Sequence, residues 1–361
     1  MKEDASVGSA LPSLMSKITL TENTSGSSVD RQSSKDTANT QADLETEMNI
    51  VFEVGRRMSQ LHLCENHSCS CIACLDDFDY IELQIEEYRD SVTSKLLETG
   101  FLEIYQQVIR RCFKKAVTEG DDVSENACLS VMIDSSNIVT RMTDNSFEAC
   151  RKIIQLELDI DIISSLKSGH LDPRQKKQSF SSTRCDLVDA LVKVLYNVVQ
   201  VATEARELYR EQGIIEVIQR FRTGISNDLS CSTLMLLAWV ISDNENFILN
   251  SSDEDFSFLN QELQSSLHEV RHRSENEYKA VELLAAINKL IVNDANKVRF
   301  VKSGCLSSYV AFLEPQFDAE EQFLAAQGLC ALAFKYAEEI KNEKTCVESK
   351  QCLIMILDIT T

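Results

Sequence analysis

This sequence has little proline and little glycine, with three prolines and ten glycines in 361 residues. Both residues interrupt helices and build turns, so a fold of many short strands is disfavoured and long helices are favoured. The sequence also lacks an apolar run long enough to cross a bilayer, and no secretory leader pattern opens it. We therefore expect a helical cytoplasmic protein without a membrane span.

Positive charge is scarce, because 36 lysines and arginines face 57 aspartates and glutamates, for a formal net charge of -21. Such a field repels phosphate backbones and anionic membrane surfaces. We expect no nucleic-acid ligand, and we expect protein partners that carry basic or extended segments. The composition leaves the oligomeric state open.

Motifs of nucleotide-binding and hydrolytic enzymes are missing too. The chain contains no GxxxxGK, no GxGxxG and no GxSxG, which are the patterns that cradle phosphates or present a nucleophilic serine. We therefore expect no catalytic activity and no cofactor. The thirteen cysteines are an odd number spread along a long chain, which is typical of reduced thiols in the cytoplasm.

The first 45 residues are rich in serine, threonine, aspartate and lysine. They carry too few apolar side chains to offset the entropy of ordering a chain. We predict a disordered tail over residues 1–45, whose role stays open, and one helical domain over residues 46–361.

A helical unit that recurs along the chain is clearest over residues 282–313. Its first half places Leu283, Ile287 and Leu290 on one stripe, at steps of three and four. A turn, a short apolar helix and Gly304 follow, and the glycine predicts a helix end in the left-handed conformation. Similar patterns predict helix ends near residues 100, 157, 213, 258, 304 and 351. The later spacings are about the forty-odd residues of armadillo or HEAT units.

The combination of apolar helix, Asn/Asp turn, short helix, Lys-Ser-Gly and second apolar helix resembles the armadillo repeat family over residues 90–361, and more weakly from residue 44. HEAT repeats are the alternative. The resemblance implies an all-α, right-handed α-solenoid of about five to six three-helix repeats, the last one incomplete. It also implies that the third helices line a concave groove that binds extended peptides or protein surfaces.

Where this family binds peptides, an asparagine late in the third helix hydrogen-bonds the ligand main chain, and Asn197 matches that position. Alignment on apolar residues gives Arg141, Trp239, Lys289 and Ala331 as the equivalents. Counting back from the glycine selects Asn288 instead of Lys289. We hypothesise that Asn197, Trp239 and Lys289 line one surface.

A second motif supports a hypothesis of another class. His268 and His272 with Glu269 match HExxH, in which two histidines one turn apart bind zinc and the glutamate acts as a base. Arg271 and Arg273 flank these residues, which is typical of a solvated helix end instead of a buried zinc helix. A zinc-dependent hydrolase remains the alternative function.

Four cysteines lie close together, at positions Cys64, Cys69, Cys71 and Cys74. Thiolates bind zinc well, but this spacing is not that of two paired C-x-x-C knuckles. Metal or redox chemistry and plain helix packing both stay open here. Other cysteines fall on apolar helical stripes, where we expect core packing, namely Cys112, Cys150, Cys231 and Cys330.

We predict from these features a non-catalytic protein-binding scaffold or adaptor in intracellular signalling or trafficking. The chain ends on LIMILDI without a polar capping helix, whereas the ends of helical arrays need polar caps. A fragment or isoform of a larger armadillo-containing signalling adaptor is therefore a further alternative.

Overall fold

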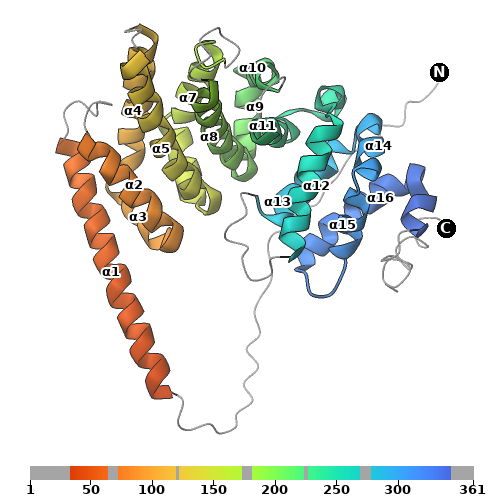
Figure 1. Ribbon diagram of the computed structural model, residues 1–361, viewed down its shortest axis with the longest axis horizontal. Helices are drawn as coiled ribbons and strands as arrows, with labels where there is room; N and C mark the ends of the chain where they lie inside the picture. The colour runs from red at the N-terminus through yellow and green to blue at the C-terminus, as the bar shows by residue number, and fades with distance from the viewer. Residues whose placement is uncertain are drawn as a thin grey trace, which may run out of the picture. The chain divides into compact units, whose positions relative to one another are not determined.

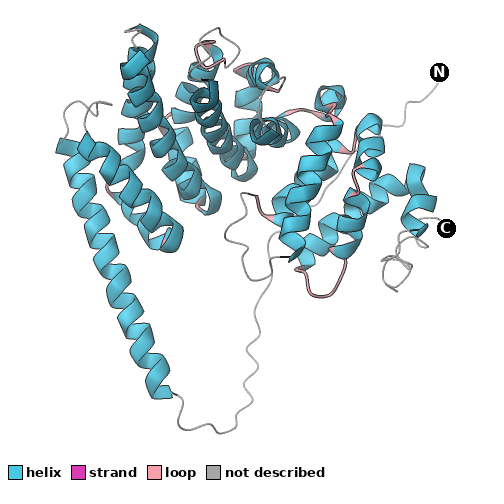
Figure 2. Ribbon diagram, viewed as in Figure 1, coloured by secondary structure: helices cyan, strands magenta, loops and turns pink. Residues whose placement is uncertain are grey.

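The computed structural model describes residues 33–63, 72–118, 122–172, 181–222, 227–268 and 278–342. These residues form sixteen α-helices and one 3-10 helix, and none of them belongs to a strand (Figure 2). The predicted all-α class is confirmed. Within the same ranges, no helix has both the length and the apolar character that a bilayer requires.

The chain divides into two units, Met1–Thr46 and Glu47–Thr361. In the first unit, residues 33–46 are helical and belong to α1 (Ser33–Leu63). This helix therefore begins inside the segment predicted to be a disordered tail. The rest of that predicted tail, residues 1–32, lies outside the described residues.

In the second unit, the later part of α1 packs against α2 (Ile72–Glu87). Val54, Met58 and Leu61 are buried at steps of four and three, which puts them on one helical face. On a neighbouring face, the Arg57 guanidinium lies 2.9 Å from an Asp77 carboxylate oxygen of α2. A half-buried ion pair thus joins the two helices.

Five three-helix units follow α2. Each has a short first helix, a second helix that begins after a sharp turn, and a third helix; in the fourth unit the first helix is of the 3-10 type. The units are α3 (Arg89–Glu98), α4 (Phe101–Thr118) and α5 (Asp122–Asn145); α6 (Phe147–Gln155), α7 (Leu158–Lys167) and α8 (Ser181–Val201); α9 (Thr203–Glu211), α10 (Ile214–Phe221) and α11 (Asn227–Val240); η2 (Asp243–Leu249), α12 (Asp253–His268) and α13 (Ala280–Leu290); and α14 (Asp294–Lys302), α15 (Cys305–Ala311) and α16 (Ala319–Asn342).

The turn between the first and second helices repeats the same backbone conformation in four units. Gly100, Gly213 and Gly304 have φ angles of 77°, 67° and 86°, and Glu157 occupies the same place with a φ of 54°. Glycine adopts this left-handed conformation without a steric penalty, whereas a side chain there is strained. The helix ends predicted near residues 100, 157, 213 and 304 are confirmed.

The helix end predicted near residue 258 is wrong, because Phe258 lies inside α12. In that unit the first helix is the 3-10 helix η2, and the chain turns after it at Asn250, whose backbone is extended with a ψ of 106°. Side chains hold this turn: the Asn296 amide donates to the Leu249 carbonyl over 2.7 Å and accepts from the Ser251 N–H over 3.1 Å. The last predicted helix end, near residue 351, lies outside the described residues.

Hydrogen-bonding side chains begin several of the first helices immediately after a third helix ends. Ser146 follows α5 and accepts from the Ala149 N–H over 3.1 Å. Asn293 does the same between α13 and α14, accepting from the Ala295 N–H over 2.9 Å. Such caps satisfy backbone donors that a helix start leaves without partners. They allow consecutive units to join through turns of only a few residues.

The third helices of successive units contact one another in series, from α2 to α5, α8, α11, α13 and α16. The second helices also contact one another in two series, from α4 to α7 and α10, and from α12 to α15. Figure 1 shows the third helices α5, α8 and α11 following one another beside their second helices. Each unit therefore buries its apolar faces against the preceding and following units, as in repeat proteins.

The core that results is continuous along these contacts and includes several thiols. Cys112, Cys150 and Cys231 are buried, as the apolar stripes predicted, while Cys330 is half-buried. Burial raises the pKa of the Cys150 thiol to about 12, since a low-dielectric surrounding disfavours the thiolate. The Cys150 thiol therefore packs as a small apolar group and is a poor nucleophile.

Candidate partner-binding surface

The residues predicted to line a groove all lie on third helices. Arg141 belongs to α5, Asn197 to α8, Trp239 to α11, and Asn288 and Lys289 to α13. Asn197 is buried and the other four are half-buried. The alignment on apolar residues therefore selected equivalent helices, although the side chains differ in what they contact.

Trp239 and Lys289 lie together. The Lys289 ammonium nitrogen is 5.0 Å from the centroid of the Trp239 ring. A second cation approaches the same ring, because the guanidinium carbon of Arg206, on α9, is 4.7 Å from its centroid. Cations within about 6 Å of an indole centroid are attracted by the ring quadrupole. Three helices from two units thus converge on the only tryptophan of the chain.

Asn197 has a different role from the one that the resemblance implied. Its side-chain amide donates to the Thr140 carbonyl and to the Thr143 hydroxyl, both over 3.0 Å. Both acceptors belong to α5, so the amide ties two adjacent third helices together. Since an amide nitrogen carries two N–H donors, Asn197 has none left for a ligand main chain.

Asn288 also joins third helices, but toward the following unit. Its amide donates to the Leu324 carbonyl of α16 over 2.8 Å, and its oxygen accepts from the Tyr309 hydroxyl over 3.1 Å. Gly328 of α16 faces this pair so closely that a Cβ atom would collide with Asn288 and Tyr309. Between the two alternatives for α13, Lys289 therefore lies beside Trp239, and Asn288 packs away from it.

Arg141 lies among carboxylates at the amino-terminal end of the series of third helices. Its guanidinium is 3.5 Å from a Glu82 carboxylate oxygen of α2. Asp134 lies on the same helix as Arg141. Its pKa is raised to about 6 by burial and by the nearby Asp79 and Glu82 carboxylates. We call Asp79, Glu82 and Asp134 the acidic cluster, and it carries excess negative charge on the faces of α2 and α5.

The residues at the start of α13 contact the third helices of three earlier units. The Tyr278 hydroxyl lies 2.6 Å from the Ser232 hydroxyl of α11, and its ring packs edge-on against Tyr196 of α8 with centroids 6.3 Å apart. The next residue, Lys279, places its ammonium 3.1 Å from an Asp144 carboxylate oxygen at the end of α5. This part of the third-helix surface is therefore covered by the chain itself.

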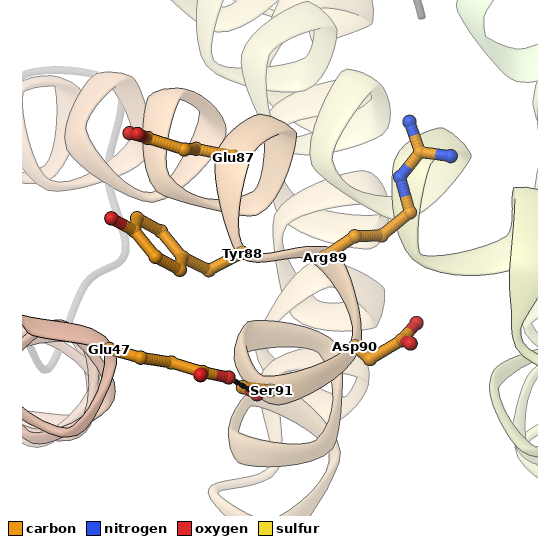
Figure 3. Close-up of a pocket in the computed structure, with 6 residues that line it drawn as sticks. All are labelled: Glu47, Glu87, Tyr88, Arg89, Asp90 and Ser91. Atoms are coloured by element: carbon orange, nitrogen blue, oxygen red, sulfur yellow. Dashed lines mark hydrogen bonds between the residues drawn. The ribbon is translucent and has the colours of Figure 1, made fainter. Parts of the chain in front are cut away.

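A depression lies where α2 ends and α3 begins (Figure 3). It is lined by residues 87–91 and by Glu47 of α1, whose carboxylate accepts from the Ser91 hydroxyl. Arg89 is its one cation, and the Arg89 guanidinium pairs with Asp144 over 3.0 Å. None of the residues predicted from the sequence belongs to this depression.

Sequence reasoning missed several residues of this surface. Arg206 lies on a first helix, and Asp134 and Tyr278 lie outside the stretch where the family's ligand-binding asparagine aligns. Their roles come from contacts between units, which local periodicity does not encode. The one available signal was the position of Tyr278 directly before the apolar run of α13.

Two predicted clusters lie largely outside the described residues. His268 is the last residue of α12, and Glu269 and His272 follow in the range 269–277 that the structure does not describe. Of the four clustered cysteines, three lie in the range 64–71, which the structure does not describe either. Cys74 lies in the first turn of α2, and its side chain is not described. Both metal hypotheses therefore stay predictions.

No protein-family model matches this chain, and no curated protein is similar to it in sequence.

Proposed function

We propose that this chain is an armadillo-type, right-handed α-solenoid that acts as a non-catalytic protein-binding scaffold. The observation that carries the proposal is the series of contacts between third helices, from α2 through α16. A repeated third helix in direct contact with its neighbours offers an extended surface on which a partner segment can lie. The left-handed turn that precedes the second helix in four of the five units supports the same repeat type.

The partner that suits this surface carries a basic, extended segment. The acidic cluster places three carboxylates on α2 and α5, and the net charge of -21 adds a long-range attraction for cations. Charge complementarity of this kind speeds encounter and selects the partner more than it adds affinity. Arg141, Trp239 and Lys289 extend the surface along α5, α11 and α13 with half-buried side chains.

Binding of a labelled octalysine peptide to the full chain, followed by fluorescence anisotropy, tests this proposal. The Asp79→Asn/Asp134→Asn variant removes two charges from the acidic cluster, while Glu211→Gln/Glu216→Gln removes two exposed charges from α9 and α10. We expect the first variant to bind several-fold more weakly than the second, at unchanged helicity. Equal binding by the two variants would show that attraction to the whole chain, and no particular surface, holds the peptide.

A further inference from the structure

The contacts of Trp239 leave one cation without a balancing anion. Arg206 donates its Nε–H to the Val199 carbonyl over 3.1 Å and lies over the Trp239 ring. Among the described residues, it makes no ion pair, and its terminal N–H groups have no hydrogen-bond acceptor. Burial lowers the pKa of the Arg206 guanidinium, with no carboxylate to oppose the shift.

This arrangement differs from that of the other half-buried arginines. Each of the other half-buried arginines in the described ranges forms an ion pair with a carboxylate; these are Arg57, Arg89, Arg141, Arg210, Arg222 and Arg299. Arg210, one turn after Arg206 on α9, lies 2.5 Å from Glu245. In a chain with so many carboxylates, a partly desolvated arginine without one marks a position open to an external anion.

We propose that Arg206, together with Lys289 beside the Trp239 ring, binds a carboxylate side chain of the partner segment. A guanidinium presents parallel N–H donors that match the two oxygens of a carboxylate. The indole ring attracts both cations, whose charged groups lie 4.7 Å and 5.0 Å from its centroid. Lys289 adds a second positive charge from a different unit, so the subsite requires α9, α11 and α13 together.

This inference rests on the proposed function and adds a direction to it. The acidic cluster lies on α2 and α5, whereas the Arg206–Trp239–Lys289 subsite lies on α9, α11 and α13. The third-helix surface is therefore acidic at one end and cationic farther along. A segment that is basic at one end and carries a short acidic stretch fits it in a single orientation. A purely acidic partner is disfavoured, because the net charge of -21 repels it.

Trp239 reports directly on the subsite, because it is the only tryptophan of the chain. The probes are two eight-residue peptides, Lys-Lys-Glu-Glu-Glu-Glu-Lys-Lys and the matched peptide with four glutamines in the centre. Each is titrated into the full chain while Trp239 fluorescence is recorded. We expect a saturable change with the glutamate peptide and none with the glutamine peptide. An equal response to both, or no saturable response to either, would overturn the proposal.

Variants locate the effect on the subsite. Arg206→Gln and Lys289→Gln should each weaken binding of the glutamate peptide by about tenfold, since each removes a charge-assisted contact. Arg220→Gln, on the exposed face of α10, is the matched control and should change nothing. Arg206→Lys keeps the positive charge but lacks the paired N–H donors, so it should bind the glutamate peptide with intermediate strength. If Arg206→Gln lowers the helicity, Arg206→Lys is used in its place. Unchanged binding by Arg206→Gln, or by Arg206→Lys in that case, would contradict the proposal.

Two further outcomes separate this inference from the proposed function. If a single-stranded oligonucleotide changes Trp239 fluorescence as strongly as the glutamate peptide, the subsite binds anions in general and is not specific for a carboxylate of a protein partner. If octalysine still binds at the acidic cluster but the glutamate peptide gives no response, the proposed scaffold function stands and the proposed anion subsite is wrong. If the two carboxylate variants bind octalysine equally while the glutamate peptide still changes Trp239 fluorescence, the subsite stands and the role of the acidic cluster is wrong.

Discussion

The side-chain amide of Asn197, on α8, donates to the backbone carbonyl of Thr140, on α5, over 3.0 Å. This bond crosses between third helices of adjacent units and is partly buried. A carbonyl oxygen within a helix normally accepts one hydrogen bond, from an N–H of the same helix. The Asn197 amide therefore donates to the second lone pair of the Thr140 carbonyl oxygen. Polar side chains between the third helices thus fix how one unit sits on the next.

Replacing Asn197 should weaken the junction between these two units. Asn197→Ala removes two donated hydrogen bonds and leaves the Thr143 hydroxyl without this partner, which costs about 1–3 kcal/mol of unfolding free energy. Urea denaturation followed by circular dichroism measures the change. Gln219→Ala, at an exposed position of α10, is the control and should stay within about 0.5 kcal/mol. A value for Asn197→Ala inside the control range would contradict the buried role.

The left-handed turns predict two substitutions of opposite sign. Gly213→Ala puts a Cβ atom on a residue with a φ of 67° and should lower stability by about 1 kcal/mol. Glu157→Gly relieves the same strain at a φ of 54°, and after the extra entropy of glycine it should raise stability by about 0.5 kcal/mol. Both changes are read as shifts of the thermal midpoint. Shifts of the same sign would mean that the two turns are not equivalent.

Two helical glycines should respond differently to alanine. Gly328→Ala places a Cβ atom against Asn288 and Tyr309 between α13 and α16, so overpacking should cost about 1–3 kcal/mol. Gly55→Ala, in α1, meets only the flexible end of the Lys95 side chain and should gain about 0.5–1 kcal/mol from helix propensity. Chemical denaturation of both variants gives the comparison. If Gly328→Ala is as stable as the natural chain, α16 does not pack closely against α13.

Asp134 predicts a pH dependence of stability. Its pKa is raised from 3.8 to about 6 by burial and by the Asp79 and Glu82 carboxylates, so the folded state holds this proton more tightly than the unfolded state. The stability that the bound proton provides is complete below about pH 3.8 and is lost as the pH rises through about 6. Asp134→Asn should therefore gain stability relative to the natural chain between pH 4 and pH 7, whereas Glu211→Gln should not. A constant difference between Asp134→Asn and the natural chain across that range would contradict the shift.

The sequence predicts the repeating frame of this fold better than its surface. Apolar steps of three and four gave the all-helical class, and glycines at positions 100, 213 and 304 marked turns that the structure contains. Even the turn at Glu157, which lacks the glycine, was predicted from a weaker copy of the same apolar pattern. The fourth unit escaped this reasoning, because its first helix is a 3-10 helix that side chains of α14 hold.

The surface is harder to predict because it depends on small rotations. A shift of one residue turns a side chain by about 100° around a helix, which separates Lys289 beside Trp239 from Asn288 against α16. Asn197 matched a ligand-binding position by sequence, yet the adjacent helix takes both of its donors. Arg206 reaches Trp239 from another helix of the same unit, a contact that no local pattern encodes.

The most direct test of the central claim is site-specific photo-crosslinking of the full chain in cells. A photoreactive residue is placed at Arg141 or Ala331, on the third helices α5 and α16, and for comparison at Glu216 or Arg220, on the exposed side of α10. We expect covalent adducts with partner proteins from the third-helix positions and none from α10. Adducts of equal yield from α10, or no adducts from either third helix, would contradict the claim that partners bind along the third helices.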